Sequence, residues 1–381
     1  MSESLLQADK VCFQYSKKAG DVLKSIDINM DAGKKTALMG CNGAGKSTLF
    51  SVLNALYKPR EGTVRFKGEP LKYKHKEILR MRTDVAILFQ NPNDMMFRPY
   101  VYQDVAFGPE NLKLPKEEVE QRVNEALFQV GMEAYAKSPI MKLSYGQRKR
   151  ITLAGVLALR PKAIILDEPT AGLDPQMAYE VMEITEQLHS SGVTVIMSSH
   201  DTDLTYAWAD ELRVLNDGKC MYAGDPESFY SNYQDVQTAG LLLPTVYRMN
   251  QTLAHLGICD VEPYPKTQSQ LSLKMVDRKD RDFGVLHVVR TDRDTDLNAV
   301  LEENDLNGIP RGIYGISARF AQRHSELSVD FPYNAPESCT MKCLSGSDAV
   351  LICDPLMYEK AVSSANFING YGYGKMRIDV I

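Results

Sequence analysis

A glycine-rich segment near the start of the chain has the residue types that bind phosphate groups. Residues 40–48 read Gly-Cys-Asn-Gly-Ala-Gly-Lys-Ser-Thr. Glycines let the backbone fold closely around phosphate oxygens, and its N–H groups meet the anion at the start of a helix, where the helix dipole favours negative charge. In this pattern Lys46 supplies positive charge to the β- and γ-phosphates, and the Ser47 hydroxyl is a ligand for Mg²⁺. The residues we expect at this nucleotide site are Gly40, Asn42, Gly43, Ala44, Gly45, Lys46, Ser47 and Thr48.

Two adjacent carboxylates, Asp167 and Glu168, follow an apolar run at residues 164–166. A buried strand that ends there places both at the carboxyl edge of a sheet, where ligands bind in doubly wound α/β folds. We expect Asp167 to hold Mg²⁺ through a bound water and Glu168 to polarise the attacking water as a general base. Many strands simply end in solvated acids, so this pair indicates ATP hydrolysis only in company with the phosphate-binding segment.

A second candidate anion site lies at residues 143–147, which read Leu-Ser-Tyr-Gly-Gln and precede a helical segment at 148–159. The Ser144 hydroxyl and the backbone N–H groups around Gly146 and Gln147 would stand at the N-terminus of that helix. One chain does not need two anion sites for one γ-phosphate. We therefore predict a head-to-tail pair of domains, in which each presents this segment to the nucleotide that the other holds. The complete set of residues in one chain favours a homodimer, and a heterodimer stays open.

The elements that must position these residues alternate between strands and helices from residue 5 to residue 223. Such alternation predicts an α/β domain with a largely parallel sheet that is covered by helices. Asp174 is a predicted N-cap, because apolar residues recur at helical spacing after it. The elements predicted nearest the candidate residues are strands at 35–39, 163–166 and 193–197 and a helix at 48–56.

Past residue 223 the pattern changes and indicates a second, smaller α/β domain. A helical stretch is predicted at 240–256, and residues 260–270 have the composition of a linker. Beyond it we expect strands at 285–289, 312–316 and 350–353 and helices at 295–303 and 355–367. The predicted domains are a nucleotide-binding domain at 1–228, a helical extension with its linker at 229–270, and a small domain at 271–381 with a regulatory or dimer-stabilising role.

Composition and charge exclude some classes of function. The 381 residues are 44% hydrophobic and 24% charged, as in ordinary globular proteins. A net charge of −5 argues against a dedicated nucleic-acid binder. No apolar stretch approaches the roughly 18 residues of a membrane span, and the first residues are not a secretory signal. We expect a cytoplasmic protein.

The cysteines do not form a disulfide framework, because there are seven of them at irregular spacings. Reduced thiols in a reducing compartment fit this count better. Cys339, Cys343 and Cys353, with His324, have the donor atoms of a cobalt or nickel site. Their spacing is loose and buried unpaired cysteines are common, so we favour a structural role for them.

The order of these motifs resembles that of the ATP-binding subunits of ABC transporters. The resemblance implies a P-loop NTPase fold of the ABC type that uses ATP and Mg²⁺. By position, Tyr15 corresponds to the residue that stacks on adenine, and Gln90 to the glutamine that contacts Mg²⁺ and relays to the membrane subunit. Asp174 ends the loop that crosses the dimer interface, and His200 corresponds to the histidine that contacts the γ-phosphate. Tyr145 departs from the family pattern, which usually has glycine there; we expect activity to survive, at a rate that the sequence leaves open.

Residues 88–94 and 104–111 narrow the resemblance to the ATPases of energy-coupling factor importers, in particular the cobalt and nickel type. Residues 241–257 are similar to the helical extension of that group. This implies a peripheral protein on the cytoplasmic face of the membrane, with a transmembrane coupling subunit and a substrate-binding membrane component as partners and without nucleic acid. Vitamin importers use similar subunits, so import of a vitamin stays open as an alternative.

Residues 90–108 are expected to contact the coupling subunit. Met95, Met96 and Phe97 lie beside prolines there, as suits an adaptable docking surface, although a loop with a local core would have the same composition. Two other classes of function are less favoured. A soluble ABC-type ATPase that acts on nucleic acid or ribosomes would carry a heptad insertion or a second phosphate-binding segment. A regulator with a vestigial ATPase would not retain the hydrolytic residues.

Overall fold

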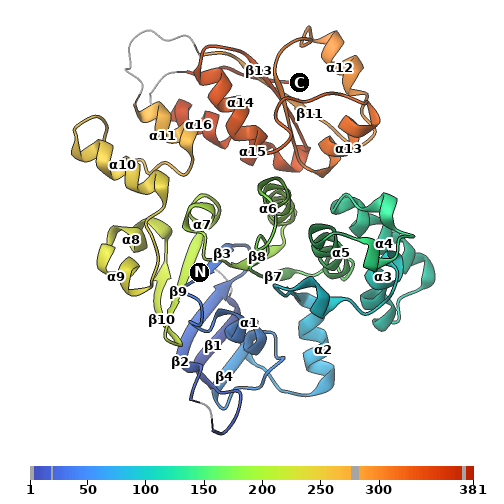
Figure 1. Cartoon of the computed structure of the whole chain (residues 1–381), viewed down its shortest axis with the longest axis vertical. Coiled ribbons are helices and arrows are strands. Elements are labelled where there is room, and N and C mark those ends of the chain that lie inside the picture. Colours follow the sequence, from blue (N-terminus) through green and yellow to red (C-terminus); the bar gives the residue numbers. More distant parts are fainter. Residues whose placement is uncertain (1–3, 19, 276–282, 371–374) are drawn as a thin grey trace. The chain divides into compact units, whose positions relative to one another are not determined.

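The computed structural model describes residues 4–18, 20–275, 283–370 and 375–381 (Figure 1). Residues 1–3, where we found no secretory signal, lie outside the described residues. Contacts divide the chain into two compact units, one of residues 1–181 and 191–243 and the other of residues 182–190 and 244–381. The domain boundaries predicted at residues 228 and 270 stay predictions.

The larger sheet of the first unit is the parallel sheet that the sequence predicts. Its six strands lie in the order β10-β9-β3-β8-β7-β6. Their bounds are Lys219–Gly224 (β10), Glu211–Asn216 (β9), Lys35–Met39 (β3), Thr194–Ser198 (β8), Ala163–Asp167 (β7) and Val85–Leu88 (β6). Neighbouring strands pair in parallel except β9 with β10. The central strands β3, β8 and β7 are buried along their whole length, as expected for a sheet covered on both faces.

The first unit also contains an antiparallel sheet, which the sequence analysis missed. Its strands lie in the order β2-β1-β4-β5. Their bounds are Leu23–Asp31 (β2), Ser4–Phe13 (β1), Glu61–Phe66 (β4) and Glu69–Pro70 (β5). Only residues 14–22 connect β1 to β2, and a parallel crossover needs a dozen residues or more. The connection is therefore too short for the parallel arrangement that we extended to this region.

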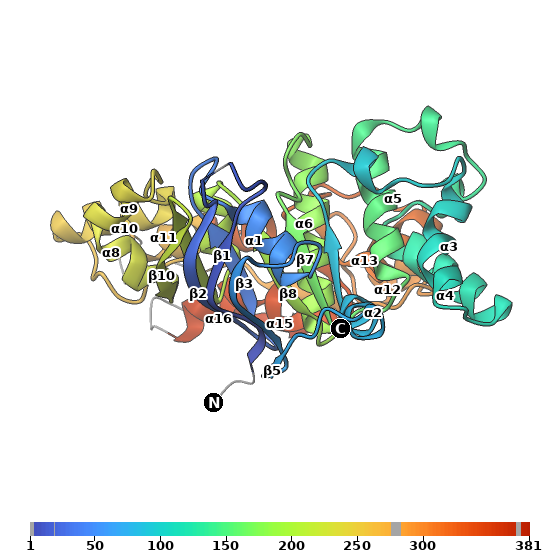
Figure 2. The same ribbon diagram turned by 90° about the horizontal axis from the view of Figure 1, so that it is seen from below.

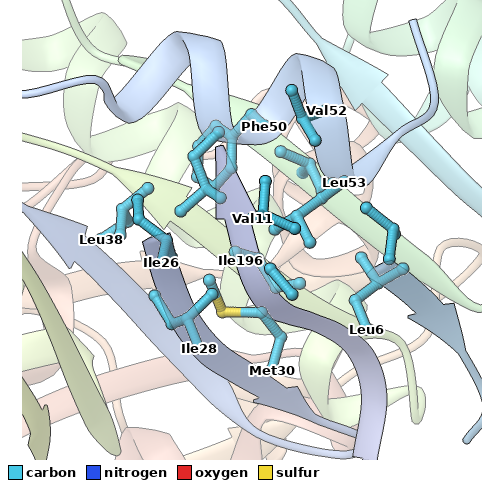
Figure 3. Packing of buried hydrophobic residues seen from close by; sticks show 14 of the residues in the cluster. Leu6, Val11, Ile26, Ile28, Met30, Leu38, Phe50, Val52, Leu53 and Ile196 are labelled. Carbon is cyan, nitrogen blue, oxygen red and sulfur yellow. The ribbon is translucent and has the colours of Figure 1, made fainter. Parts of the chain in front are cut away.

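Helix α1 (Lys46–Leu53) packs between the two sheets and joins their cores. Figure 3 shows Phe50 and Leu53 of this helix beside Val11 of the antiparallel sheet, with Leu38 and Ile196 of the parallel sheet nearby. These side chains belong to one buried cluster. Burial of this kind is the dominant stabilising contribution to folding. The helix that begins in the phosphate-binding segment is thus fixed on two sides.

The remaining helices of the first unit cover the larger sheet or extend beyond it. They are α2 (His75–Asp84), α3 (Val101–Asn111), α4 (Lys116–Gln129), α5 (Tyr145–Leu157), α7 (Thr202–Trp208), α8 (Pro226–Ser231) and α9 (Tyr233–Thr238), with short 3-10 turns at Pro92–Met95, Glu133–Tyr135 and Ile140–Lys142. Helices α3, α4 and α5 pack on one another (Figure 2). Among the described residues, no helix combines the length and the apolar character needed to cross a membrane.

Two helix starts bear on the candidate site. Helix α6 (Pro175–Ser190) follows Asp174, whose Oδ1 accepts a hydrogen bond from the N–H of Met177 at 2.8 Å, which confirms the predicted cap. Helix α5 begins at Tyr145, before the predicted start at residue 148. The reason is a capping box, in which Ser144 and Gln147 each bond the other's backbone N–H.

The second unit is built on a parallel sheet in the order β12-β13-β11-β14. The strands are Arg311–Tyr314 (β12), Ala349–Cys353 (β13), Leu286–Arg290 (β11) and Ile378–Val380 (β14). The helices are α10 (Thr245–His255), α11 (Gln268–Lys274), α12 (Leu297–Glu303), α13 (Ile316–His324), α14 (Ala335–Leu344), α15 (Tyr358–Ala361) and α16 (Ser363–Gly370), with a 3-10 turn at Pro355–Met357. The smaller α/β fold is confirmed, although β14, α11, α13 and α14 had no predicted counterpart, and α11 begins within the residues 260–270 that were predicted as a linker.

Three of the cysteines of the second unit lie in its apolar core. Cys339, Cys343 and Cys353 are fully buried among leucines, alanines and methionines. Burial raises the pKa of Cys343 and of Cys353 to about 12. His324 is exposed on α13, and the described residues contain no group of three or more His, Cys, Asp or Glu that could hold a metal ion. The burial of these thiols in an apolar core agrees with the structural role that the sequence favours.

Candidate nucleotide site

Four neighbouring parallel strands of the larger sheet end at one edge, and predicted site residues follow each of them. The phosphate-binding segment follows β3, Gln90 follows β6, and His200 follows β8. Asp167 is the last residue of β7 and Glu168 comes next. These strands are adjacent in the order β3-β8-β7-β6. Parallel strands present their carboxyl ends on the same side, so the fold gathers residues that are far apart in the sequence.

The phosphate-binding segment forms a tight loop that leads into α1. Gly40 has a φ of 140°, and a β-carbon added there would lie 2.3 Å from the carbonyl oxygen of Leu215, so only glycine fits. The ammonium of Lys46 donates to the carbonyl oxygens of Gly40 at 2.7 Å and of Cys41 at 3.2 Å. The loop thus holds a positive charge at the start of a helix. Asn42, Gly43 and Ser47 are exposed, whereas Ala44, Gly45 and Thr48 are buried.

Tyr15 lies next to this loop. Its hydroxyl is 2.8 Å from Oγ1 of Thr48. Its ring makes edge contacts with Phe13 and Tyr57, at centroid distances of 5.2 and 5.7 Å. The side chain is nevertheless 59% exposed. An exposed aromatic ring beside a phosphate-binding loop is suited to stack on a nucleotide base.

Ser198 connects the carboxylate of Asp167 to the backbone of Glu168. Its hydroxyl donates to Oδ1 of Asp167 at 2.6 Å and accepts from the backbone N–H of Glu168 at 3.0 Å. Nδ1 of His200 lies 2.9 Å from Oε2 of Glu168. Asp167 and Glu168 are buried, whereas the His200 side chain is 66% exposed. Hydrogen bonds therefore hold the Asp167 carboxylate to Ser198 and the Glu168 carboxylate to an exposed histidine.

Ser198 was not among the site residues predicted from the sequence. A serine at the end of an apolar strand has no motif of its own. Its role follows from strand register, because Ser198 of β8 lies directly beside Asp167 of β7. Pairing of the two predicted strands by their last residues would have placed the hydroxyl next to the carboxylate.

The structure also shows Lys149 behind Glu168. Its ammonium donates to the carbonyl oxygens of Glu168 at 2.9 Å and Ala171 at 3.2 Å. Burial lowers the pKa of Lys149 to about 8, although the carboxylates of Glu168 and Asp167 act in the opposite direction. Glu168 itself has a φ of 47°, a conformation that costs free energy for a non-glycine residue. The backbone around the proposed base is thus held in a strained conformation by a buried lysine.

The second candidate anion site lies on a different element. Oγ of Ser144 accepts from the N–H of Gln147 at 3.2 Å, and Oε1 of Gln147 accepts from the N–H of Ser144 at 2.9 Å. Ser144 is exposed and Gly146 is buried. Figures 1 and 2 both show α5, which begins here, apart from α1. The fold therefore gathers the phosphate-binding loop, Gln90, the carboxylates and His200 at one edge of the sheet, and the Ser144 turn lies apart from the phosphate-binding loop.

The predicted metal ligands offer a hydroxyl on Ser47, an amide on Gln90 and a carboxylate on Asp167. Ser47 and Gln90 are exposed, and Asp167 is oriented by Ser198. All three supply oxygen, the donor atom that Mg²⁺ prefers, and only one of them is charged. Such a set leaves coordination positions for water and phosphate oxygens, so the residues fit Mg²⁺.

A cavity of about 250 Å³ lies next to the residues expected to contact the coupling subunit. Phe97 is 63% exposed at this cavity and its ring stacks on Phe107 at 5.0 Å. The buried Asp104 accepts from the N–H groups of Phe97 and Arg98 at 2.7 and 2.9 Å and fixes this segment. Other residues that line the cavity include Val156 of α5, Ile87 of β6 and Leu159, which follows α5.

Comparison with known proteins agrees with this geometry. Residues 23–171 match the family described as ABC transporter. The chain is 47% identical over 249 residues to the energy-coupling factor transporter ATP-binding protein EcfA of Methanocaldococcus jannaschii, which covers 65% of this chain and 89% of that protein. It is 32% identical over 377 residues to EcfA2 of Methanospirillum hungatei, which covers 96% of this chain and 94% of that protein. The second relative therefore spans both units.

Among solved structures, the chain is similar to cbiO1 from Clostridium perfringens, which is described as part of the ABC transporter complex cbiONQ. The two share 36% identity with a TM-score of 0.57, over 67% of this chain and 98% of that chain. ABC transporter cassettes have also been solved as dimers, one of them bound to ADP and phosphate.

Proposed function

Because the chain belongs to the ATP-binding proteins of energy-coupling factor ABC transporters, we propose that it powers the import of a transition metal ion, cobalt or nickel. As a member of this family it is the ATPase subunit of an importer. The observation that carries the metal is the pair of segments at 88–94 and 104–111, which resemble the cobalt and nickel type. The similarity to cbiO1 agrees with it.

Nucleotide binding requires Lys46 to exchange one set of oxygens for another. In the structure its ammonium bonds the carbonyls of Gly40 and Cys41. The β- and γ-phosphates would replace these acceptors, because charge-assisted bonds to phosphate are stronger than bonds to neutral carbonyls. Tyr15 would stack on the adenine, and Ser47, Gln90 and Asp167 would hold Mg²⁺, which neutralises charge on the phosphate oxygens.

Glu168 is the proposed general base. Its carboxylate is buried and bonded to His200, so its position is defined before substrate arrives. It would accept the proton of the water that attacks the γ-phosphate. The His200 side chain is 66% exposed and would contact the γ-phosphate. The Ser198 hydroxyl bonds the Asp167 carboxylate and the backbone N–H of Glu168. It would therefore orient Asp167 for Mg²⁺ and leave the Glu168 carboxylate available to the attacking water.

The Ser144 turn would complete the site of a second copy. Ser144 and the N-terminus of α5 suit an anion. The phosphate-binding loop of the same chain leads into a different helix, α1, which lies apart from α5 (Figure 2). We infer a head-to-tail homodimer with two ATP molecules at its interface, in which Asp174 lies in the loop that crosses between copies. Closure on ATP and reopening after hydrolysis would then supply the movement for transport.

The cavity beside Phe97 is the proposed docking site for the transmembrane coupling subunit. Apolar residues of α5 and β6 line part of this cavity. Two other lining residues, Met95 and Phe97, follow Gln90, a proposed Mg²⁺ ligand, within a few residues of the chain. Movement at the nucleotide can therefore reach the partner through one short segment. We place the protein on the cytoplasmic face of the membrane, held there by this subunit and the substrate-binding component.

Uptake of labelled Co²⁺ and Ni²⁺ tests the proposed substrate. Cells that lack this protein should lose most uptake of one of the two ions, and the parent gene should restore it. Glu168→Gln should fail to restore it, whereas Glu117→Gln, an exposed change on α4, should succeed. Loss of vitamin uptake with normal metal uptake would contradict the metal and leave the ATPase assignment intact.

A further inference from the structure

The first turns of α5 contact the loop that follows the proposed base. Tyr145, the departure from the family pattern, packs its ring on this loop: a β-carbon added to Gly172 would lie 3.2 Å from Cε1 of Tyr145. The Tyr145 hydroxyl also lies 3.5 Å from the carbonyl oxygen of Gln90. One side chain at the Ser144 turn thus contacts two segments of the chain's own nucleotide site.

Lys149, one helical turn further along α5, makes the second contact. Its ammonium bonds the carbonyl oxygens of Glu168 and Ala171, and the residue is only 2% exposed. The Glu168 carbonyl also accepts from the N–H of Ala171 at 3.2 Å, which closes a backbone turn from Glu168 to Ala171. The lysine therefore bonds the first and the last carbonyl of a turn that begins at the proposed base. A buried lysine is costly unless its donors are satisfied, and here two of them hold backbone that carries the general base.

Two more contacts make this connection tight. A β-carbon at Gly146 would lie 2.2 Å from Sδ of Met177, so α5 and the start of α6 are in close contact at this point. Arg150 forms an ion pair with Glu180 on α6. Packing at this density leaves the two helices little freedom to slide past each other.

We propose that Lys149 and Tyr145 are positioning residues that make the Ser144 turn and the Glu168 loop move as one body. The Ser144 turn would serve the nucleotide of a second copy, and Glu168 acts on the nucleotide of its own chain. A rigid connection between them means that engagement of the partner's γ-phosphate sets the position of the chain's own base. This rests on the proposed two-copy ATPase, and it assigns the link between the two sites to named side chains.

Steady-state ATPase activity of the full chain tests the role of Lys149. Lys149→Met keeps an unbranched side chain of similar length but removes all donors, and we expect kcat to fall about tenfold while KM changes less than about twofold. Lys149→Gln should recover part of kcat, because its amide N–H can still donate to a carbonyl. Lys142→Met is the matched control, since Lys142 is exposed just before the Ser144 turn, and it should behave like the parent.

Tyr145→Gly tests the ring, and it keeps the proposal testable if Lys149→Met does not fold. It should lower kcat and speed amide exchange at residues 171–173 without nucleotide. Tyr145→Phe should change both less, because the ring makes the closer contact and a hydroxyl at 3.5 Å contributes little. Parental kcat and parental exchange in both Lys149→Met and Tyr145→Gly would overturn the proposal. These measurements need neither a membrane partner nor metal, so a failure of metal uptake would leave their outcome unaffected.

Discussion

The two units contain parallel sheets of the same kind but use the carboxyl edges of those sheets in opposite ways. In the first unit the edge carries exposed groups, among them Ser47, Gln90 and His200. In the second unit the corresponding helix start is already filled: the N–H of Gly315, before α13, donates to Glu183 at 2.6 Å, and Arg319 bonds the same carboxylate. The same fold chemistry thus produces an open ligand site in one unit and an internal ion pair in the other.

The largest expected effect is on ATP hydrolysis at the carboxyl edge of the first unit's sheet. Glu168→Gln should keep ATP binding but lower kcat by about 10²-fold or more, because a general base contributes roughly that much. Glu302→Gln, an exposed change in the second unit, should leave kcat at the parental value. Nucleotide binding and phosphate release measured on both variants decide the point. Hydrolysis by Glu168→Gln at the parental rate would show that the base lies elsewhere.

The second effect is on the stability of the second unit, where Arg319 pairs with Glu183 at the carboxyl edge of the sheet. Arg319→Met leaves the Glu183 carboxylate buried with one fewer cation, and breaking a buried ion pair costs about 3 kcal/mol. We expect earlier thermal unfolding and faster amide exchange in the second unit with little change in kcat. Arg377→Met removes an exposed pair in the same unit and should cost less than about 1 kcal/mol. A selective loss of ATPase activity in Arg319→Met would mean that this edge, too, takes part in function.

The third effect compares two buried hydroxyls. Ser198→Ala removes the bridge between Asp167 and Glu168 and leaves a buried N–H without its acceptor, a loss of about 1–3 kcal/mol. We expect a fall in kcat, which Ser198→Thr should largely avoid. Ser269→Ala removes a similarly buried hydroxyl that donates to Glu337 in the second unit, and it should lower stability without lowering kcat. Equal kinetic effects of the two alanine variants would remove the distinction between the units.

How much the sequence predicted also differs between the units. In the first, the segment at 40–48 and the Asp167–Glu168 pair lie on the predicted elements, because each motif occupies consecutive residues. Ser198 and Lys149 were missed, because their partners lie in other elements and become visible only through strand register and helix packing. Lysine is also rarely buried, so nothing in its neighbourhood marked it.

The second unit was predicted as a fold and no further. Its central strands were found from apolar runs at 285–289 and 350–353, and β11 and β13 confirm them. Helix α14 was missed because Ala335–Leu344 mixes polar residues and cysteines without clear periodicity. No motif marked Glu183 as a partner of Arg319, since the two lie far apart in the sequence. Long-range ion pairs of this kind leave no local signal.

The smallest effect at neutral pH concerns the thiols of the closed unit. Burial raises the pKa of Cys343 and of Cys353 from 9.0 to about 12, so the unfolded chain loses these protons at a lower pH than the folded protein does. The contribution of these two thiols to the free energy of unfolding is therefore fully present below pH 9. It is lost as pH rises from 9 toward 12, because in that range the folded state binds more protons than the unfolded chain does. Unfolding of the parent and of Cys353→Ala should be measured from pH 7 to 11. The difference between their free energies of unfolding should shrink as pH rises.

Thiol labelling is a second measurement on the same core. In native protein at pH 8 an alkylating agent should label the exposed Cys41 long before Cys343 or Cys353. Early labelling of Cys343 or Cys353 would show that this core opens readily, and the second unit would then lack the closed character that separates it from the first.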